Sequence, residues 1–332
     1  MVVPLRKELA DALAREPHPR LTVVRAGGLG DTLLILPTLQ LLAQHLYQGE
    51  LAFIGSAWAE QLWPILGLRE DPGGRRLLRF DSPQLTPMFG PAAESDPTGA
   101  FSQAHAAVLY VRSPGDVLLA SARRFCQGPV VDWPVEPTGG EHAAVHLTRA
   151  VAQVPITAQE LPTPVLEVPP SLARQAQEWL REHCGPASRA VALHPGSGGL
   201  RKCWPVERFA ALAEQVEGPV VLLEGPADRE PCRRLEELLA GPKRPARASG
   251  LSLPAVAALI AQCRLYVGND SGLTHLSAAL GVATVAIFGP TDPMIWAPLG
   301  PRVTPVAVGD ASAHGAWPPV EEVLMAAEQL AS

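Results

Sequence analysis

The sequence predicts an α/β protein built from two doubly wound, Rossmann-like domains. Its 332 residues exceed what one hydrophobic core usually serves. Apolar strand-like runs alternate with helical segments, which is typical of parallel sheets covered on both faces. The alternation stops at residues 153–170, which contain five prolines, and then starts again. We therefore expect domains over residues 1–160 and 161–315, and a closing helix within residues 316–332 that packs back toward the first domain.

The first domain begins with a short apolar strand over residues 21–25. The turn Ala-Gly-Gly-Leu-Gly-Asp follows, and a helical pattern then covers residues 32–46. A strand, a glycine-rich turn and a helix in this order are typical of nucleotide-binding folds. Further strands are expected over residues 51–55, 76–80, 106–111 and 130–133, and further helices over residues 57–66, 114–125 and 141–151.

The second domain repeats this alternation. Its expected strands cover residues 190–193, 220–223, 263–268 and 282–288. Its expected helices cover residues 172–183, 206–216, 229–239, 254–263, 273–280 and 320–330. Two consecutive domains of this type, facing a central cleft, favour the GT-B architecture.

Composition excludes several classes of protein. A net charge of −6 without a long basic block argues against nucleic-acid binding. The five cysteines include no Cys-x-x-Cys pair, and the histidines lack ligand spacing, so neither disulfides nor a metal is expected. No apolar run approaches the ~20 residues of a membrane span, and the charged start does not resemble a signal peptide. We expect a cytoplasmic protein.

The segment Val-Gly-Asn-Asp-Ser-Gly-Leu-Thr-His places polar residues where a strand meets a helix. A helix start offers free N–H groups and a positive dipole end to a phosphate, so Ser271 and Gly272 are candidate diphosphate ligands. Asp270 would repel a phosphate and is expected to contact hydroxyls of a sugar. Two alternatives stay open: Ser271 is only a helix cap, and His275 is a packed helix residue instead of a ligand.

The segment His-Pro-Gly-Ser-Gly-Gly-Leu-Arg-Lys-Cys-Trp-Pro, residues 194–205, also leaves a strand. Its glycines let backbone N–H groups converge on an anion, and Lys202 adds a mobile positive charge. The chain has only three lysines and one asparagine, Asn269, so it retains a rare residue in each of these two segments. The alternative is a surface loop with an exposed lysine.

Carboxylates complete the candidate site. Asp31 follows the first glycine-rich turn and is a candidate general base, although an Asp there also stabilises a helix dipole. Asp228, Glu224 and Glu230 surround the turn after another strand, where a carboxylate accepts ribose hydroxyls or only faces a helix end.

Three segments together resemble glycosyltransferase family 9, the heptosyltransferases that build bacterial surface saccharides. The first is Gly-Leu-Gly-Asp with Leu-Leu-Ile-Leu-Pro-Thr-Leu, the second is His-Pro-Gly-Ser with Lys-Cys-Trp-Pro, and the third is Asp-Ser-Gly-Leu-Thr-His with Phe-Gly-Pro-Thr-Asp-Pro. The resemblance implies a GT-B fold and inverting transfer of a sugar, usually heptose from ADP-heptose, without a metal or cofactor.

The resemblance also implies roles for single residues. Asp31 would deprotonate the acceptor and Asp270 would contact the donor sugar, while Asp228 and Leu251 would hold the ribose and base. The diphosphate ligands would be Lys202, Ser197, Ser271, Gly272 and His275.

The acceptor side departs from the family, since Leu-Tyr-Val-Arg-Ser stands at residues 109–113 in place of its usual motif. Gly30 and Arg112 are the acceptor candidates, and the acceptor is expected to be a lipopolysaccharide-type saccharide or glycolipid at the inner membrane surface. A non-catalytic nucleotide-sugar-binding protein and an NAD-dependent oxidoreductase are the alternatives. Against the oxidoreductase, Leu33 replaces the third glycine of a dinucleotide fingerprint.

Overall fold

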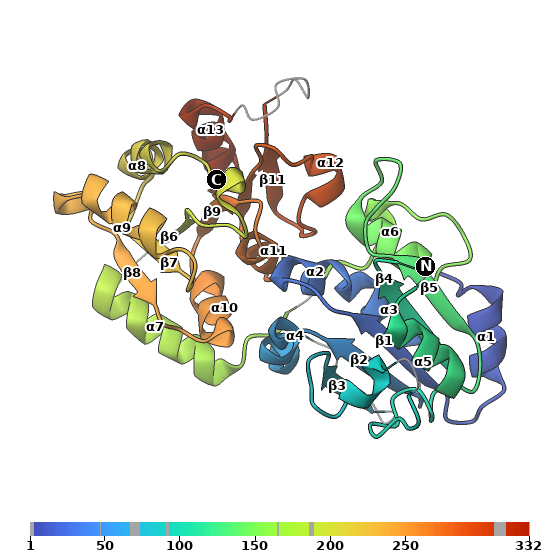
Figure 1. Ribbon diagram of the computed structural model, residues 1–332. Coiled ribbons are helices and arrows are strands. Elements are labelled where there is room, and N and C mark those ends of the chain that lie inside the picture. The colour runs from blue at the N-terminus through green and yellow to red at the C-terminus, as the bar shows by residue number, and fades with distance from the viewer. Residues whose placement is uncertain are drawn as a thin grey trace. The chain divides into compact units, whose positions relative to one another are not determined.

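The computed structural model describes residues 3–46, 48–66, 74–90, 93–113, 115–164, 166–185, 189–308 and 317–331. The chain folds into two compact units, Met1–Pro162 and Thr163–Ser332, and each contains one parallel sheet flanked by helices (Figure 1).

The first unit contains a five-stranded sheet with the order β3-β2-β1-β4-β5, in which every pair is parallel. The strands are β1 (Arg20–Arg25), β2 (Glu50–Gly55), β3 (Arg75–Arg79), β4 (Ala106–Val111) and β5 (Val130–Pro134). The chain runs outward from β1 to β3 and then restarts on the other side of β1 with β4. Ligands of such sheets bind beyond the carboxyl ends of the strands at this reversal. The turns after β1 and β4 therefore occupy the favoured position.

The helices of the first unit are α1 (Lys7–Ala14), α2 (Leu29–Leu34), α3 (Leu36–His45), α4 (Ala57–Leu62), α5 (Val117–Phe125) and α6 (Ala143–Arg149), with short 3-10 turns at Trp63–Ile65, Thr86–Phe89 and Ala158–Glu160. The single helix expected over residues 32–46 is divided at Ile35. Pro37 lies in the first turn of α3, where its missing N–H breaks no intrahelical hydrogen bond. The short α2 thus begins directly after the glycine-rich turn.

The second unit contains a six-stranded parallel sheet with the order β11-β10-β9-β6-β7-β8. The strands are β6 (Val191–His194), β7 (Val220–Glu224), β8 (Ala246–Ser249), β9 (Leu265–Asn269), β10 (Thr284–Ile287) and β11 (Val303–Val306). Strands β8 and β11 were not predicted from the sequence. Both are short edge strands, and β11 contains Pro305, which an edge strand tolerates because its N–H is not needed on the open side. Here the reversal lies between β6 and β9.

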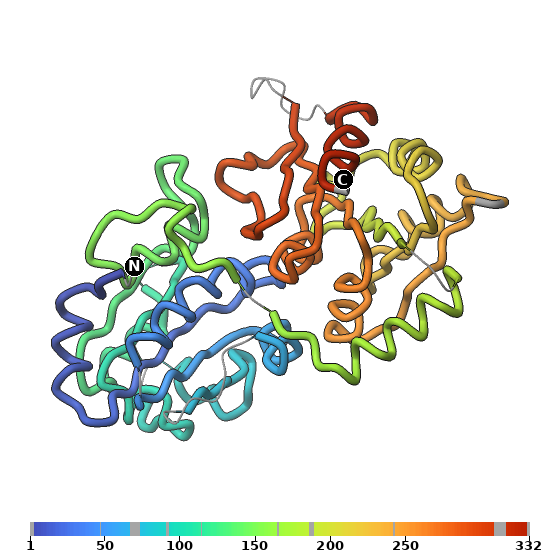
Figure 2. The backbone as a smooth tube through the Cα atoms, turned by 180° about the vertical axis from the view of Figure 1, so that it is seen from behind, coloured from blue at the N-terminus to red at the C-terminus, as the bar shows by residue number. Residues whose placement is uncertain are grey.

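The helices of the second unit are α7 (Pro170–Cys184), α8 (Val206–Gln215), α9 (Arg229–Leu238), α10 (Leu253–Ala261), α11 (Gly272–Ala279), α12 (Pro293–Trp296) and α13 (Val320–Ala331), with 3-10 turns at Leu200–Lys202 and Gly241–Lys243. The long α7 packs along α10 (Figure 2). Gln177 Nε2 of α7 donates to Oε1 of Gln262, just after α10, at 3.1 Å. Within the described ranges, every helix is too short or too polar to cross a bilayer.

The closing helix α13 is part of the core of the second unit. We expected residues 316–332 to pack back toward the first domain, and residues 316 and 332 lie outside the described ranges. The buried residues of α13, including Val323 and Ala327, belong to the core of the second unit, together with Trp204. Packing of the helix toward the first domain stays a prediction. Trp204 Nε1 also donates to the carbonyl of Pro318 at 3.0 Å, just before α13 begins. Burial of this apolar face therefore anchors α13 to the second unit.

Candidate functional site

The junction of β9 and α11 places Asp270 and Ser271 beyond the carboxyl end of a central strand. Both side chains are buried, with 8% and 9% of their residues' surface exposed. Ser271 precedes the first residue of α11 in extended backbone, but its hydroxyl accepts no hydrogen bond from a helix amide. The Thr274 amide already donates to the Ser271 carbonyl at 3.1 Å. A helix leaves its first amides, here those of Gly272 and Leu273, without an intrahelical acceptor, and its positive dipole end lies here. Ser271 is therefore not the simple helix cap of the alternative interpretation.

Asp270 joins three loops of the second unit. Its Oδ2 accepts hydrogen bonds from Lys202 Nζ at 2.7 Å and from Thr291 Oγ1 at 2.8 Å. Its backbone carbonyl accepts from Ser197 Oγ at 2.7 Å. The loops after β6, β9 and β10 thus meet at one carboxylate. Three of the residues expected at the donor site, Ser197, Lys202 and Asp270, are in direct contact.

The single asparagine of the chain, Asn269, holds the loop after β6 in shape. Its Nδ2 donates to the carbonyls of Pro195 and Gly196 at 2.9 and 3.1 Å, and its Oδ1 accepts from the Trp204 amide at 2.8 Å. Asn269 is fully buried. One amide side chain thereby fixes both ends of the loop that carries Ser197 and Lys202.

The expected ribose ligand, Asp228, lies at the start of α9 with 8% of its surface exposed. Its Oδ2 accepts from the Gly225 amide at 3.0 Å and lies 3.0 Å from His194 Nε2. Burial raises the pKa of Asp228, but the hydrogen bond and charge of His194 and the Gly225 amide outweigh it and leave the pKa below its ordinary value. A Cβ on Gly196 would lie 1.9 Å from Asp228 Oδ1. The glycine is therefore required for this close approach of the two loops.

The two other carboxylates near this turn are paired. Glu224 accepts a two-pronged hydrogen bond from Arg247, and the exposed Glu230 pairs with Arg233 at 2.7 Å. Leu251, the expected base contact, follows β8 and is 38% exposed. An apolar side chain left open at this edge of the sheet is available to a flat aromatic ring.

In the first unit, Asp31 lies in the first turn of α2 and contacts Arg25, the last residue of β1. Arg25 Nη2 lies 2.5 Å from Asp31 Oδ1, and the Gly28 amide donates to Asp31 Oδ2 at 2.8 Å. Burial lowers the pKa of Arg25, and the charge of Asp31 opposes that shift. A Cβ on Gly27 would lie 2.5 Å from Asp31 Oδ2, so the glycine-rich turn is needed for the carboxylate to fold back over it.

The two acceptor candidates also lie in the first unit. Arg112 is exposed directly after β4, and its charge lowers the pKa of Arg25, which places it in the electrostatic neighbourhood of Asp31. Gly30 lies in the first turn of α2. Both therefore lie at the edge of the sheet where β1 and β4 end.

Three residues that the sequence did not single out, Arg25, His194 and Thr291, contact the predicted site residues. All three stand inside or beside the quoted segments, so a signal was present, but their contacts cross between segments. His275 is buried in α11, in agreement with the packed interpretation, and its expected contact with a ligand stays a prediction. Within the described residues, no group of three or more His, Cys, Asp or Glu side chains could hold a metal ion.

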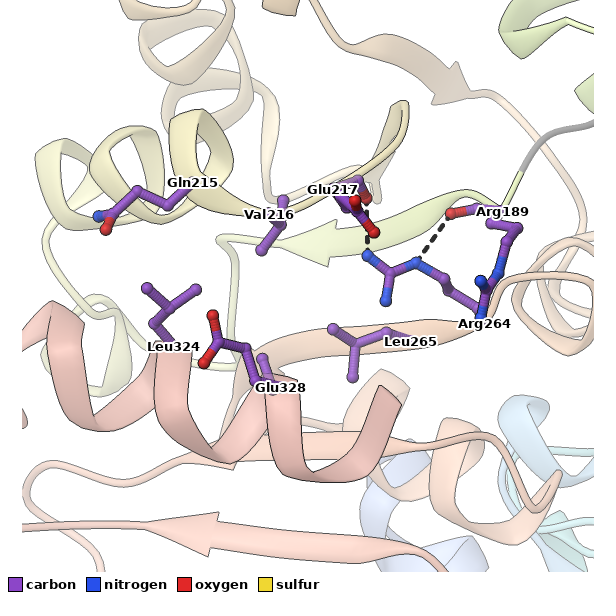
Figure 3. Close-up of a pocket in the computed structure, with 9 residues that line it drawn as sticks. Arg189, Gln215, Val216, Glu217, Arg264, Leu265, Leu324 and Glu328 are labelled. Atoms are coloured by element: carbon purple, nitrogen blue, oxygen red, sulfur yellow. Dashed lines mark hydrogen bonds between the residues drawn. The ribbon is translucent and has the colours of Figure 1, made fainter. Parts of the chain in front are cut away.

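A pocket of about 270 Å³ lies elsewhere in the second unit (Figure 3). It opens near the amino ends of β6 and β9, and its wall includes Arg264, Glu217 and Glu328 of α13. Arg264 donates to the carbonyls of Arg189 and Glu217 at 3.1 and 2.6 Å. No residue of the predicted site lines this pocket, which lies at the opposite edge of the sheet.

A family model described as glycosyltransferase family 9 (heptosyltransferase) matches residues 117–315, more than half of the chain. The chain belongs to glycosyltransferase family 9. This membership confirms the resemblance seen in the three sequence segments and decides against the NAD-dependent oxidoreductase alternative.

Curated relatives match only part of the chain. Lipopolysaccharide heptosyltransferase 3 of Escherichia coli is 28% identical over 151 residues, which cover 44% of this chain and 44% of that protein. The match thus spans less than half of the relative's length.

Solved structures match nearly the whole chain. A family 9 glycosyltransferase from Veillonella parvula has a TM-score of 0.75 at 19% identity, covering 95% of this chain and 98% of its own. The E. coli ADP-heptose lps heptosyltransferase II has a TM-score of 0.73 at 19% identity, covering 94% and 98%. These likenesses confirm the predicted GT-B fold class.

Proposed function

We propose that this family 9 protein transfers a heptose from ADP-heptose to a saccharide acceptor of the lipopolysaccharide core, with inversion at the anomeric carbon. The observation that carries the proposal is the meeting of three loops at Asp270, directly before α11. The names of the E. coli relatives, which are heptosyltransferases, support the choice of sugar and acceptor class.

In this proposal the donor diphosphate binds at the start of α11. The Gly272 amide and the Ser271 hydroxyl donate to phosphate oxygens, and His275 stands one turn further along. Ser197 reaches the phosphate when its hydroxyl turns away from the Asp270 carbonyl, to which it donates in this structure. Lys202, which is 39% exposed while Asp270 is 8% exposed, is free to turn from the carboxylate toward the leaving diphosphate. Charge-assisted hydrogen bonds of this kind contribute roughly 1.5–3 kcal/mol each. Asp270 then accepts hydroxyls of the heptose.

The nucleoside binds beside the diphosphate in the loops after β7 and β8. One oxygen of Asp228 is held by Gly225 and His194, and the other oxygen accepts a ribose hydroxyl. Leu251 packs against the adenine ring. The Arg247 and Arg233 partners of Glu224 and Glu230 favour Asp228 among the three carboxylates first considered.

Asp31 acts as the general base of the reaction. Arg25 and the Gly28 amide each occupy one carboxylate oxygen, and each oxygen has a second lone pair for the proton of the acceptor hydroxyl. The hydroxyl attacks the anomeric carbon as the bond to the diphosphate breaks, so one displacement inverts the centre. Arg112 and the Gly30 backbone bind the acceptor, which we place in a glycolipid at the cytoplasmic side of the inner membrane.

The test is transfer itself. Purified protein is incubated with ADP-heptose and a lipopolysaccharide-core glycolipid, ADP release is measured, and the anomeric configuration of the product is read by NMR. We expect ADP release that depends on the acceptor and a product of inverted configuration. Binding of ADP without release from the donor would support the non-catalytic alternative instead. A matched thermal-stabilisation series with ADP, UDP, GDP and NAD tests the nucleotide, because a ligand that binds only the native state raises its stability.

A further inference from the structure

His194 lies between the ribose side and the diphosphate side of the proposed donor site. It is the last residue of β6 and is 3% exposed. Its Nε2 is 3.0 Å from Asp228 Oδ2 at the start of α9, and its Nδ1 is 3.4 Å from Ser271 Oγ before α11. One imidazole thus contacts a carboxylate through one ring nitrogen and a hydroxyl through the other.

The protonation state of this imidazole determines to which acceptor the Ser271 hydroxyl donates its single hydrogen. Asp228 is an anion, so Nε2 carries a hydrogen and donates to it. In the neutral ring Nδ1 is then an acceptor and takes the Ser271 proton. In the charged ring Nδ1 also carries a hydrogen and donates to Ser271 Oγ. The Ser271 hydroxyl is then released from His194 and is free to donate to a phosphate oxygen.

Thr274 does not remove this dependence. Its hydroxyl donates to the Asn269 carbonyl at 2.5 Å, so toward Ser271 Oγ, at 3.1 Å, it acts as an acceptor. Tyr266 also hydrogen-bonds to the Ser271 side chain, and this contact is the same in both states of His194. Ser271 therefore has one acceptor fewer inside the protein when His194 is charged than when it is neutral. The positive ring also adds attraction for the anionic ligand at short range.

Among the charged and titratable groups around His194, the Asp228 carboxylate favours this change of charge. Asp228 supplies a counter-charge from α9. Tyr266 of β9 hydrogen-bonds to Thr274 at 3.2 Å, and burial raises its pKa well above the ordinary value, so it stays neutral. Lys202 is paired with Asp270 in the neighbouring loops, and His275 lies one turn into α11.

We infer that His194 is a positioning residue that links diphosphate binding to proton uptake. Binding of ADP or an ADP-sugar draws a proton onto His194, and the imidazolium turns the Ser271 hydroxyl toward the phosphate. This inference rests on the proposed function for the identity of the ligand. Its chemistry needs only a nucleoside diphosphate at the start of α11.

The test measures proton uptake when ADP binds to the full-length protein. Isothermal titration calorimetry in two buffers of different ionisation enthalpy, between about pH 6 and 8, gives the number of protons taken up. We expect the wild type to take up more protons than Ser271→Ala and His194→Gln, by up to one per ADP. Uptake of one proton changes the Kd by about tenfold per pH unit, with tighter binding at lower pH. The titration of ADP itself is common to all variants and cancels in the comparison.

His183→Gln is the matched control, because His183 is an exposed histidine of the same unit that contacts the Trp179 carbonyl in α7. It should behave as the wild type. Equal proton uptake by wild type and Ser271→Ala would overturn the inference while leaving the proposed function intact. No ADP binding by the wild type would overturn both. If His194→Gln does not fold, Ser271→Ala still decides, and ¹⁵N NMR of the wild-type histidines must show Nδ1 of His194 protonated in the ADP complex.

Discussion

Arg25 and Asp31 form an ion pair at the carboxyl end of β1, with Arg25 Nη2 2.5 Å from Asp31 Oδ1. The guanidinium is 8% exposed and the carboxylate 33% exposed. The pair therefore presents one face of the carboxylate to solvent while its counter-charge stays inside. A carboxylate on a short helix after a glycine-rich turn would otherwise be free to rotate. We therefore propose that Arg25 orients Asp31, the proposed general base.

The first prediction concerns this pair. Asp31→Asn should lower turnover by about 10²–10⁴-fold, because the amide cannot accept the acceptor's proton. Arg25→Met should lower turnover by about tenfold or more, since misplacement of a reacting group by about 1 Å can cost 10²-fold. Both should leave ADP binding unchanged, as measured by calorimetry. Arg123→Gln is the control, because Arg123 forms an exposed pair with Asp132, and such pairs contribute little. Full turnover in Arg25→Met would remove Arg25 from this role.

The second prediction concerns Lys202. Lys202→Ala should weaken use of the ADP-sugar at least about tenfold, because a charge-assisted contact with the diphosphate is lost. Removal of this cation also leaves the 8% exposed Asp270 carboxylate with Thr291 as its remaining side-chain donor. Steady-state kinetics should show the change in both KM and kcat. Lys243→Ala in the same unit, where Lys243 only donates to the Val216 carbonyl, should behave as the wild type. Values of KM and kcat for Lys202→Ala equal to those of the wild type would exclude Lys202 from the donor site.

The sequence predicted the strands that carry this site because each central strand is a continuous apolar run, as in β9 and β10. Edge strands carry weaker signals, and β8 and β11 were missed for that reason. Hydrophobic periodicity also placed α13 correctly along the chain, but it could not say which core the helix joins. That choice depends on Trp204 and Pro318, which are 114 residues apart in the sequence and hydrogen-bonded in the structure.

For the candidate site too, some features could be predicted from the sequence and others only seen in the structure. Residue type and position next to a strand end were enough to select Asp31, Lys202 and Asp270 from the sequence. The partners that set their charge and orientation could not be selected in this way. Arg25 contacts Asp31, and Thr291 contacts Asp270, only in the folded chain. Spacing along the chain does not encode which of several nearby cations pairs with a given carboxylate.

The third prediction uses two glycines of one loop. Gly196→Ala should destabilise the protein by about 1–3 kcal/mol, because its Cβ would lie 1.9 Å from Asp228 Oδ1 and force two loops apart. It should also weaken ADP binding. Gly198→Ala is the control, since its Cβ would meet no atom within 4 Å. Urea denaturation of both variants measures the difference, and equal stability would show that the loops separate at no cost.

The fourth prediction concerns the stability of the protein at low pH. The pKa of Asp228 is lower in the folded protein than in the unfolded chain, so the unfolded state binds more protons as the pH falls. The stabilisation from this group is therefore complete above the unfolded pKa of about 3.9 and is lost as the pH falls through the folded value. Thermal denaturation should show wild type more stable than Asp228→Asn near pH 7, with the gap shrinking below about pH 4. A gap that widens below about pH 4 would contradict the lowered pKa of Asp228.

The last prediction concerns Asn269, whose amide both donates to and accepts from the loop after β6. Asn269→Asp keeps the size of the side chain but replaces the Nδ2 donor with an oxygen that faces the carbonyls of Pro195 and Gly196. A buried acceptor without its donor costs about 1–3 kcal/mol, and a charged group costs more. We therefore expect Asn269→Asp to lower the free energy of unfolding by at least about 2 kcal/mol. The folded variant should bind ADP more weakly, because the loop that carries Ser197 and Lys202 loses the hydrogen bonds that hold it.

Gln262→Glu is the matched control for Asn269→Asp. Gln262 pairs with Gln177 at an exposed site, where the new carboxylate is solvated. Wild-type stability in Asn269→Asp would mean that the loop is held by its own backbone, and the one asparagine of the chain would then have no structural reason to stand at the end of β9.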